Sequence, residues 1–378
     1  MTKRDHPHLE AKEEEKPEMT IQDLELNGIF LDENPAGEGT LPRHIDMLRA
    51  RLVDFACITA LVDGLDDDDF EQSDAWRCLH PNTCALVRDC RATSVQAKKF
   101  RERKDKEPEW QAFFDASFFT PLQNAVGIKD EDTRLSARAK YDYEYFESLA
   151  SRHWTLFGGN KKTGRKGHRQ DDRRNLTEPR PDRVAFFPIS TDGGTRIQRA
   201  KGWQSADRAQ DGITENFSFT TLQHLAKHGV ESNTAGLFRK SPTKLDTVPS
   251  NCISFPWLII EYKKLDQRAL ITKGHCQAAN AGACAIMMLE TLSKIVPEAA
   301  QNEHIPPVVT MTTAGPLVQV WIMYSCKPSV YYRMDCIWKG VITLASDVVK
   351  LQAILENTFT WAMRELRPRL STYIDLWK

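Results

Sequence analysis

The sequence contains no long hydrophobic run. No stretch approaches the roughly 18 consecutive apolar residues that a membrane-spanning helix needs. The first 18 residues, MTKRDHPHLEAKEEEKPE, are polar and hold no apolar core of the kind that a secretory signal requires. These absences predict an intracellular protein, cytoplasmic or nuclear, with no membrane partner.

Neither sign of charge is in excess. The chain holds 51 Lys and Arg against 52 Asp and Glu, which gives a formal net charge of −1. This balance argues against adhesion to nucleic acid by total charge, whereas a locally basic groove stays compatible with it, because the field at a site depends on where the charges lie. The nine cysteines are irregularly spaced and odd in number, so they cannot all pair within one chain. Reduced thiols are the simplest interpretation.

Motifs of several enzyme classes are also missing. There is no G-x-S-x-G or Cys–His motif that would support nucleophilic catalysis. The glycine-rich stretch 159–166 lacks the Gly-Lys-Ser/Thr ending of a phosphate-binding loop, which argues against a nucleoside triphosphatase. Cys78, His80, Cys84 and Cys90 lack the C-x2-C pairs of common zinc fingers.

Composition divides the chain into three parts. Hydrophobic residues make up 41% and charged residues 27% of the whole, which is typical of a globular protein. Residues 1–40 are charged and contain prolines, so we expect a disordered or loosely docked tail. Residues 41–104 carry apolar side chains at helical spacing and predict a helical N-terminal extension. Residues 105–378 form the expected main domain, with a polar insertion at 191–250.

The main domain mixes helical and strand patterns. Before the insertion, the spacing predicts helices over residues 107–120 and 131–154, and PDRVAFFPIS predicts a short strand. After the insertion, FPWLIIEYKK predicts a buried strand. A helix to about Pro297, three strands and a final amphipathic helix from Ser346 follow. This order predicts a mixed α/β domain.

Two charged residues stand at the end of the buried strand. The apolar run from Trp257 to Ile260 is followed by Glu261 and Lys263. Alternate residues of a strand point to the same face, so these two side chains project together. Charged groups in such a place are costly to desolvate without partners. A metal ion would stabilise the carboxylate, and a phosphate would satisfy the ammonium.

A second carboxylate stands at the head of another predicted strand, in Pro181-Asp182. Mg²⁺ prefers oxygen ligands and is usually held by one or two carboxylates together with waters and phosphate. Two carboxylates that converge on such an ion are what the hydrolysis of a phosphodiester requires. A nearby lysine can orient or deprotonate the attacking water, or stabilise the charge of the transition state.

This ordered set resembles the PD-(D/E)XK nuclease superfamily. The matching residues are Pro181-Asp182, the apolar strand that ends in Glu261-x-Lys263, and the helix that follows. The resemblance implies a restriction-endonuclease-like fold, in which helices flank a mixed central sheet. It also implies cleavage of DNA that depends on Mg²⁺ or Mn²⁺, with Asp182, Glu261 and Lys263 as catalytic residues.

Two further features are similar to the version of this domain found in many uncharacterised fungal proteins. Glu107 begins a helix that continues into FFDASFFTPL, and Gln277 lies on the helix after E-x-K. The resemblance covers roughly residues 105–367. It implies that Glu107 is an accessory metal ligand and that Gln277 assists catalysis.

A basic stretch precedes Asp182. Residues 152–183 hold ten Lys or Arg and four Asp or Glu. Side chains in this stretch could contact phosphates of a nucleic acid, and a flexible solvated loop is the alternative interpretation. The expected phosphate contacts are Lys161, Lys162, Arg165, Lys166 and Arg169.

Three hypotheses follow for the function. The first is a metal-dependent nuclease that acts on DNA. The second is a catalytically inactive module that keeps the fold and binds nucleic acid or a partner protein, because one fold hosts many functions. The third is a regulatory protein whose N-terminal helical part is the active one, which deletion of residues 1–100 would test.

Overall fold

Buried strands from the last third of the chain form the centre of the fold. The structure, a computed structural model, describes residues 19–56, 58, 64–67, 70–72, 77, 81–125, 146–150, 153–154, 176–189, 212–213, 215–234, 253–265, 268–296, 304–326 and 331–378. Its strands form one seven-stranded sheet in the order β1-β7-β6-β5-β4-β3-β2. Their bounds are β1 Ile29–Asp32, β2 Glu147–Ala150, β3 Arg183–Pro188, β4 Ile253–Lys263, β5 Val308–Ala314, β6 Leu317–Cys326 and β7 Tyr331–Val341.

The sheet is mixed. Strand β4 pairs antiparallel with β3 and parallel with β5, whereas β5, β6 and β7 follow one another as antiparallel neighbours. All eleven residues of β4 are buried, as a near-continuous apolar run predicts for a central strand. The predicted strands of this part of the chain are therefore confirmed, and they form the general α/β architecture that the sequence predicts.

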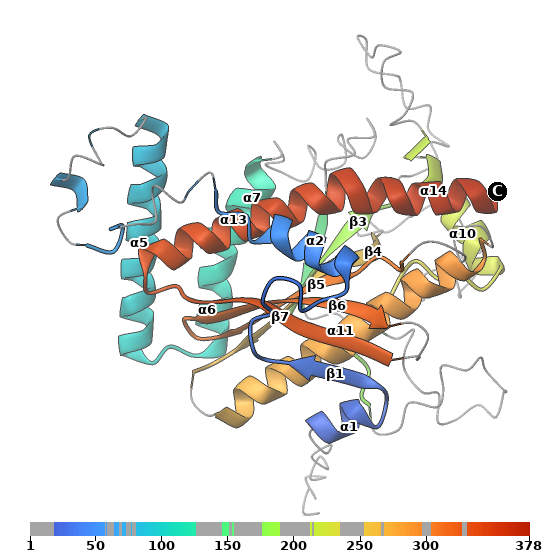
Figure 1. The fold of residues 1–378 in the computed structure, drawn as a ribbon, viewed down its shortest axis with the longest axis horizontal. Helices are drawn as coiled ribbons and strands as arrows, with labels where there is room; N and C mark the ends of the chain where they lie inside the picture. Colours follow the sequence, from blue (N-terminus) through green and yellow to red (C-terminus); the bar gives the residue numbers. More distant parts are fainter. Residues whose placement is uncertain are drawn as a thin grey trace, which may run out of the picture.

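Helices cover both faces of the sheet (Figure 1). Helix α11 connects the parallel strands β4 and β5 and packs on one face, while α2 and α13 lie on the other. The bounds of the helical elements are α1 Ile21–Glu25, α2 Arg43–Leu52, η1 Phe70–Gln72, α5 Pro81–Arg103, α6 Glu107–Phe114, η2 Asp115–Phe119, α7 Thr120–Ala125, α10 Phe219–Lys227, α11 Arg268–Lys294, α13 Ala345–Trp361, η6 Ala362–Leu366 and α14 Arg367–Trp377.

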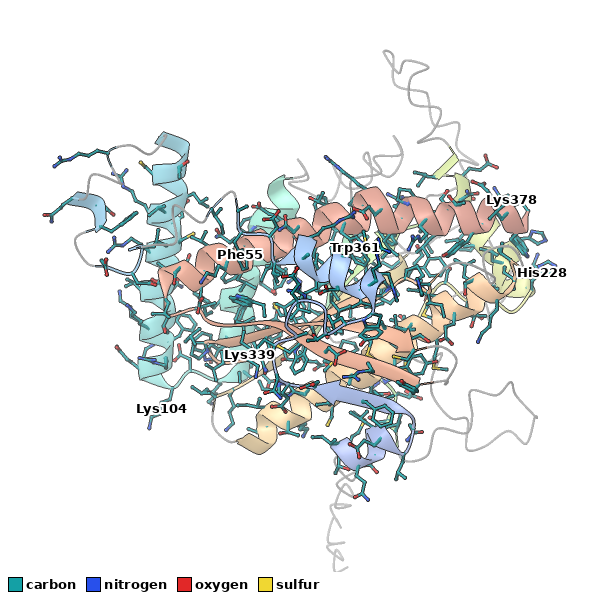
Figure 2. All side chains as sticks on the ribbon, viewed as in Figure 1. Phe55, Lys104, His228, Lys339, Trp361 and Lys378 are labelled. Atoms are coloured by element: carbon teal, nitrogen blue, oxygen red, sulfur yellow. The ribbon has the colours of Figure 1, made fainter. Side chains whose placement is uncertain are left out.

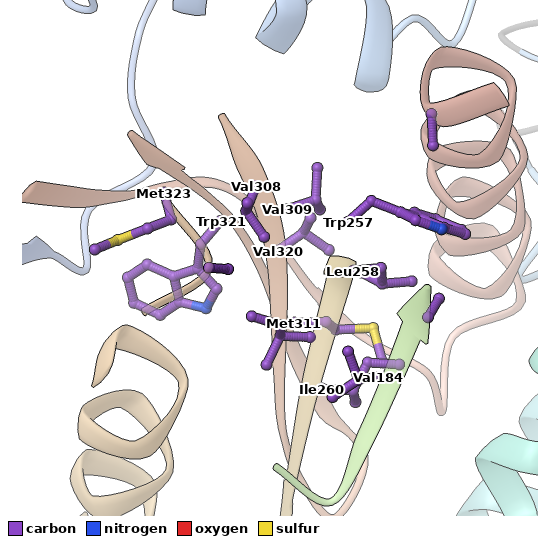
Figure 3. Packing of buried hydrophobic residues seen from close by; sticks show 14 of the residues in the cluster. Val184, Trp257, Leu258, Ile260, Val308, Val309, Met311, Val320, Trp321 and Met323 are labelled. Atoms are coloured by element: carbon purple, nitrogen blue, oxygen red, sulfur yellow. The ribbon is translucent and has the colours of Figure 1, made fainter. Parts of the chain in front are cut away.

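The core lies between the sheet and these helices, where side chains crowd together (Figure 2). On the α11 side, Trp321 and Met323 extend from β6 toward the helix (Figure 3). Gly282 lets α11 approach closely, because a Cβ at this position would lie 2.9 Å from Met323 Cγ. Close packing of α11 on the sheet fixes the height of the helix above β4 and β5.

Two segments differ from the predictions. Residues 21–25 and 29–32, in the expected tail, form α1 and β1, and β1 extends the sheet by pairing parallel with β7. Residues 147–150, expected within a helix, form β2 instead, which pairs antiparallel with β3. The helical prediction for this segment was wrong because neighbouring strands can override local spacing. The rest of the expected helix up to residue 145, and most of the insertion at 191–250, lie outside the described residues.

None of the helices in the described ranges combines the length and the apolar character that crossing a membrane requires.

Candidate active site

Strand β4 carries the two central residues of the site. Glu261 and Lys263 lie on its α11 side, and they are only 2% and 6% exposed. Tyr262 lies between them and points to the opposite face, where its ring lies 5.7 Å from that of Phe114 in α6. The alternation predicted from the sequence is thus present, and it leaves a carboxylate and an ammonium in a nearly water-free place.

Three carboxylates surround the Lys263 ammonium. Its Nζ lies 3.3 Å from Asp182 Oδ2, 3.6 Å from Glu261 Oε2 and 4.0 Å from Glu107 Oε1. Nζ also donates a hydrogen bond of 2.6 Å to the Tyr262 carbonyl. Four of the residues predicted from the sequence are therefore brought together from β4, the head of β3 and the start of α6.

The strand register explains the position of Asp182. Arg183, the first residue of β3, pairs with Ile260, so the preceding residue stands beside Glu261. The Asp182 carboxylate also accepts a hydrogen bond of 2.8 Å from the Tyr262 backbone amide. This bond ties the head of β3 to the end of β4, so the short Pro-Asp segment serves as a fixed part of the site.

Burial controls the protonation of Glu261. Desolvation raises its pKa well above the ordinary value, and the Asp182 carboxylate raises it further, while Lys263 acts in the opposite direction. Its Oε2 is buried and accepts no hydrogen bond from the described residues, because the Lys263 ammonium lies beyond hydrogen-bond length. Such an oxygen is costly to keep charged unless a cation approaches.

For the Lys263 ammonium, desolvation and the neighbouring charges shift the pKa in the opposite directions from those for Glu261. Desolvation alone would lower the pKa of Lys263, but Glu261, Asp182 and Glu107 together outweigh it and raise the pKa above 10.5. The side chain therefore stays protonated at neutral pH. In this state it compensates part of the negative charge of the acids and cannot accept a proton from water.

Glu107 is the most exposed of the three carboxylates, with 41% of its side chain accessible. It precedes Pro108 in the first turn of α6, where a negative charge is favourable because of the helix dipole. Burial raises its pKa, and the charges of Lys263, Lys273 and Lys264 oppose the increase. Three lysines therefore act on one carboxylate at the rim of the site.

A second polar cluster on the opposite face of β4 escaped the sequence reasoning. Asp115 forms an ion pair with Arg183, and the Tyr262 hydroxyl lies 3.4 Å from the same carboxylate. Asp115 begins the π-helical turn η2, and the Arg183 guanidinium lies 4.7 Å above the Phe119 ring. Single π-turns within helices are frequent at functional sites. The cluster holds α6 and η2 against β3 and β4, next to Asp182, Glu261 and Lys263.

Gln277 is a residue of helix α11, which packs on β4. A Cβ at Gly274, one turn before it, would be 3.0 Å from Lys263 Cγ, so the helix and the lysine are in direct contact. The Gln277 Oε1 atom is buried without a hydrogen-bond partner among the described residues.

The donor set fits a divalent cation in part. Over the described ranges, no three or more His, Cys, Asp or Glu gather in a group that could hold a metal ion by themselves. The acids instead surround Lys263. Mg²⁺ needs only one or two carboxylates when water and phosphate supply the other oxygens. Asp182 and the unpartnered Oε2 of Glu261 are chemically suited to that smaller set.

Comparison with family models, curated proteins and solved structures finds no match to this chain. The resemblance to the nuclease superfamily therefore depends on the sequence motifs described above. The predicted phosphate contacts Lys161, Lys162, Arg165, Lys166 and Arg169 lie outside the described residues.

Proposed function

We propose that the protein is a metal-dependent nuclease that hydrolyses phosphodiester bonds, with DNA as the expected substrate. The observation that supports it is the position of Lys263. Its ammonium lies within 4.0 Å of three carboxylates, at the end of a buried central strand. Buried acids with strongly shifted pKa values, such as Glu261, are typical of functional sites.

The roles follow from the chemistry of each residue. Asp182 and Glu261 would hold Mg²⁺ or Mn²⁺, with Glu107 as an accessory ligand. A bound ion of this kind supplies an acidic water and neutralises charge on the phosphate. Lys263 orients the attacking water or stabilises the charge of the transition state through its ammonium. Gln277 assists from α11, where its buried carbonyl oxygen needs a donor or a cation.

We also infer a restriction-endonuclease-like fold for the domain. The mixed order of β3, β4 and β5, with the parallel crossover through α11 and the acids at one end of β3 and β4, supports this assignment. The N-terminal strand β1, at the far edge of the sheet, would then be an addition to that fold.

The first experiment measures cleavage of plasmid, linear and single-stranded DNA and of RNA, with Mg²⁺ or Mn²⁺ and then with EDTA. We expect Asp182→Ala and Lys263→Ala to lower the rate on the order of 100-fold or more, because each removes a charge from the reacting centre. Lys294→Ala, at the far end of α11, is the matched control. Full activity in a folded Lys263→Ala protein would disprove the assignment.

One observation favours a second candidate, a nuclease-fold module that binds nucleic acid or a protein without cleaving it. Lys263 already pairs with Asp182 and Glu261, so part of the charge of the acids is compensated without a metal ion. For this candidate we expect salt-sensitive binding of DNA and no cleavage by the folded protein with any metal.

A further inference from the structure

A buried histidine connects the N-terminal segment to the centre of the sheet. His275 of α11 is 2% exposed. Its Nδ1 lies 3.2 Å from Oε1 of Glu33, which follows β1, and its Nε2 lies 2.7 Å from Oε1 of Gln319 in β6. The Glu33–His275–Gln319 chain therefore joins three separate elements through one imidazole.

The chemical state of the ring is consistent with this bridging role. Burial lowers the pKa of His275, although the Glu33 carboxylate acts in the opposite direction. A neutral ring donates its Nδ1–H to Glu33, and that bond fixes the tautomer. At Nε2 the facing atom is Oε1 of Gln319, which accepts from a protonated ring, whereas a neutral ring pairs with Gln319 once the amide turns its NH₂ group toward Nε2.

Gln319, the last member of the Glu33–His275–Gln319 chain, lies in the same transverse row of the sheet as Glu261. Glu261 pairs with Thr312 on β5, and Thr312 pairs with Gln319 on β6. Residues directly opposite on neighbouring strands point to the same face, so all three project toward α11. Trp321 strengthens the row, because its Nε1 donates a hydrogen bond of 3.0 Å to the Thr312 hydroxyl.

The residue next to His275 is Gly274, the point where α11 meets Lys263. An added Cβ at Gly274 would lie only 3.0 Å from Lys263 Cγ. Contact at this distance leaves little space, so a small displacement of α11 moves the lysine stem or opens a gap beside it. The height of the helix at residue 275 therefore sets the position of the ammonium.

We propose that the Glu33–His275–Gln319 chain is a positioning device, which fixes α11 over β4 and so holds the Lys263 ammonium among its three carboxylates. Glu33 and His275 are positioning residues, not catalytic ones. The effect of the Glu33–His275–Gln319 chain on catalysis rests on the proposed function, whereas its effect on the position of the Lys263 ammonium does not. The segment of β1 and α1, which also contacts α11, is then required for an intact site.

The test uses full-length variants and two measurements. Brief acetylation with acetic anhydride, quantified by mass spectrometry, compares Lys263 of β4 with Lys294, which is 69% exposed at the end of α11. We expect Glu33→Ala and His275→Gln to raise the relative labelling of Lys263 about fivefold or more, because the protecting contacts loosen. The kcat of cleavage should fall on the order of 10- to 100-fold, while KM stays within about twofold of the wild-type value, as misplacement of a catalytic group predicts.

Ser325→Ala is the matched control, because it also breaks a 2.7 Å hydrogen bond between β6 and α11, to Glu290 at the far end of the helix. We expect it to lower stability without changing Lys263 labelling. Glu33→Ala keeps the test decisive if His275→Gln fails to fold, because Glu33 is partly exposed. Equal labelling in the Glu33 variant and the control would overturn the proposal. Absence of cleavage by the wild-type protein would count against the nuclease assignment alone.

Discussion

At the scale of single residues, the site is a balance between desolvation and pairing. Glu261 and Lys263 are nearly inaccessible, and neither could stay charged there alone. Together with Asp182 and Glu107 they form a network with excess negative charge, which favours the protonated lysine and disfavours the ionised glutamate. A divalent cation or a change of pH would act on the same balance.

The pKa of Glu261 predicts how stability depends on pH. Its folded-state pKa lies above the unfolded value of 4.5, so the folded protein keeps a proton that the unfolded chain loses. Stability therefore falls as pH rises above that value. We expect Glu261→Gln to remove this decline. As pH rises, the free energy of unfolding of the variant should increase relative to that of the wild type, by about 1.4 kcal/mol for each unit by which folding raises the pKa of Glu261.

Urea denaturation at about pH 5 and about pH 8 measures this difference. The Lys263 ammonium adds no slope in that range, because its pKa is raised from an ordinary value that already lies above it. Glu365→Gln, which changes a half-exposed carboxylate on η6, is the control. Parallel pH curves for the wild type and Glu261→Gln would contradict the expectation.

At the scale of elements, helix α11 and strand β4 form the site as a pair. Two glycines of α11 approach the sheet, Gly274 at Lys263 and Gly282 at Met323. Each glycine costs the helix about 1 kcal/mol relative to alanine, so both positions would favour alanine if packing allowed it. Their close contacts are the physical reason that glycine stands there.

Gly274→Ala tests whether this contact matters for the site. We expect cleavage to fall about tenfold, because the new methyl group displaces the Lys263 stem. Gly282→Ala is the matched control, with the same gain in helix propensity and an equally close contact, but to Met323. For both variants we expect a free energy of unfolding that differs from that of the wild type by about 1 to 3 kcal/mol, the usual cost of overpacking. Equal activity losses would contradict a specific role for Gly274.

At the scale of the whole molecule, the N-terminal segment is part of the core. Strand β1 pairs with β7, and the buried side chain of Ile29 joins the hydrophobic core, while Phe30 is 41% exposed at the edge. The segment is far from Glu261 and Lys263 in sequence, but it reaches helix α11, which packs on their strand β4. Its packing therefore bears on the stability of the whole domain.

Ile29→Ala and Phe30→Ala distinguish a packed strand from a loosely docked tail. Truncation of a buried isoleucine costs about 2 to 5 kcal/mol. We expect that loss for Ile29→Ala and a loss of about 1 kcal/mol or less for Phe30→Ala, which lies at the surface. Chemical denaturation measures both values. A small effect of both substitutions would mean that β1 contributes little to the stability of the fold.

The sequence by itself determined strands β3 to β7, the long helix after β4, and Lys263 with the three acids around it. These followed because an apolar run with charges at its end has few compatible places in a fold. Tertiary structure alone decided that residues 147–150 form an edge strand, that β1 completes the sheet, and that His275 joins Glu33 to Gln319. The start of α13 is a similar case: it is capped by Asp66, whose carboxylate accepts hydrogen bonds from the Ala345 amide and the Ser346 hydroxyl. Partners far apart in the sequence leave no periodic signal, because only the folded chain brings them together.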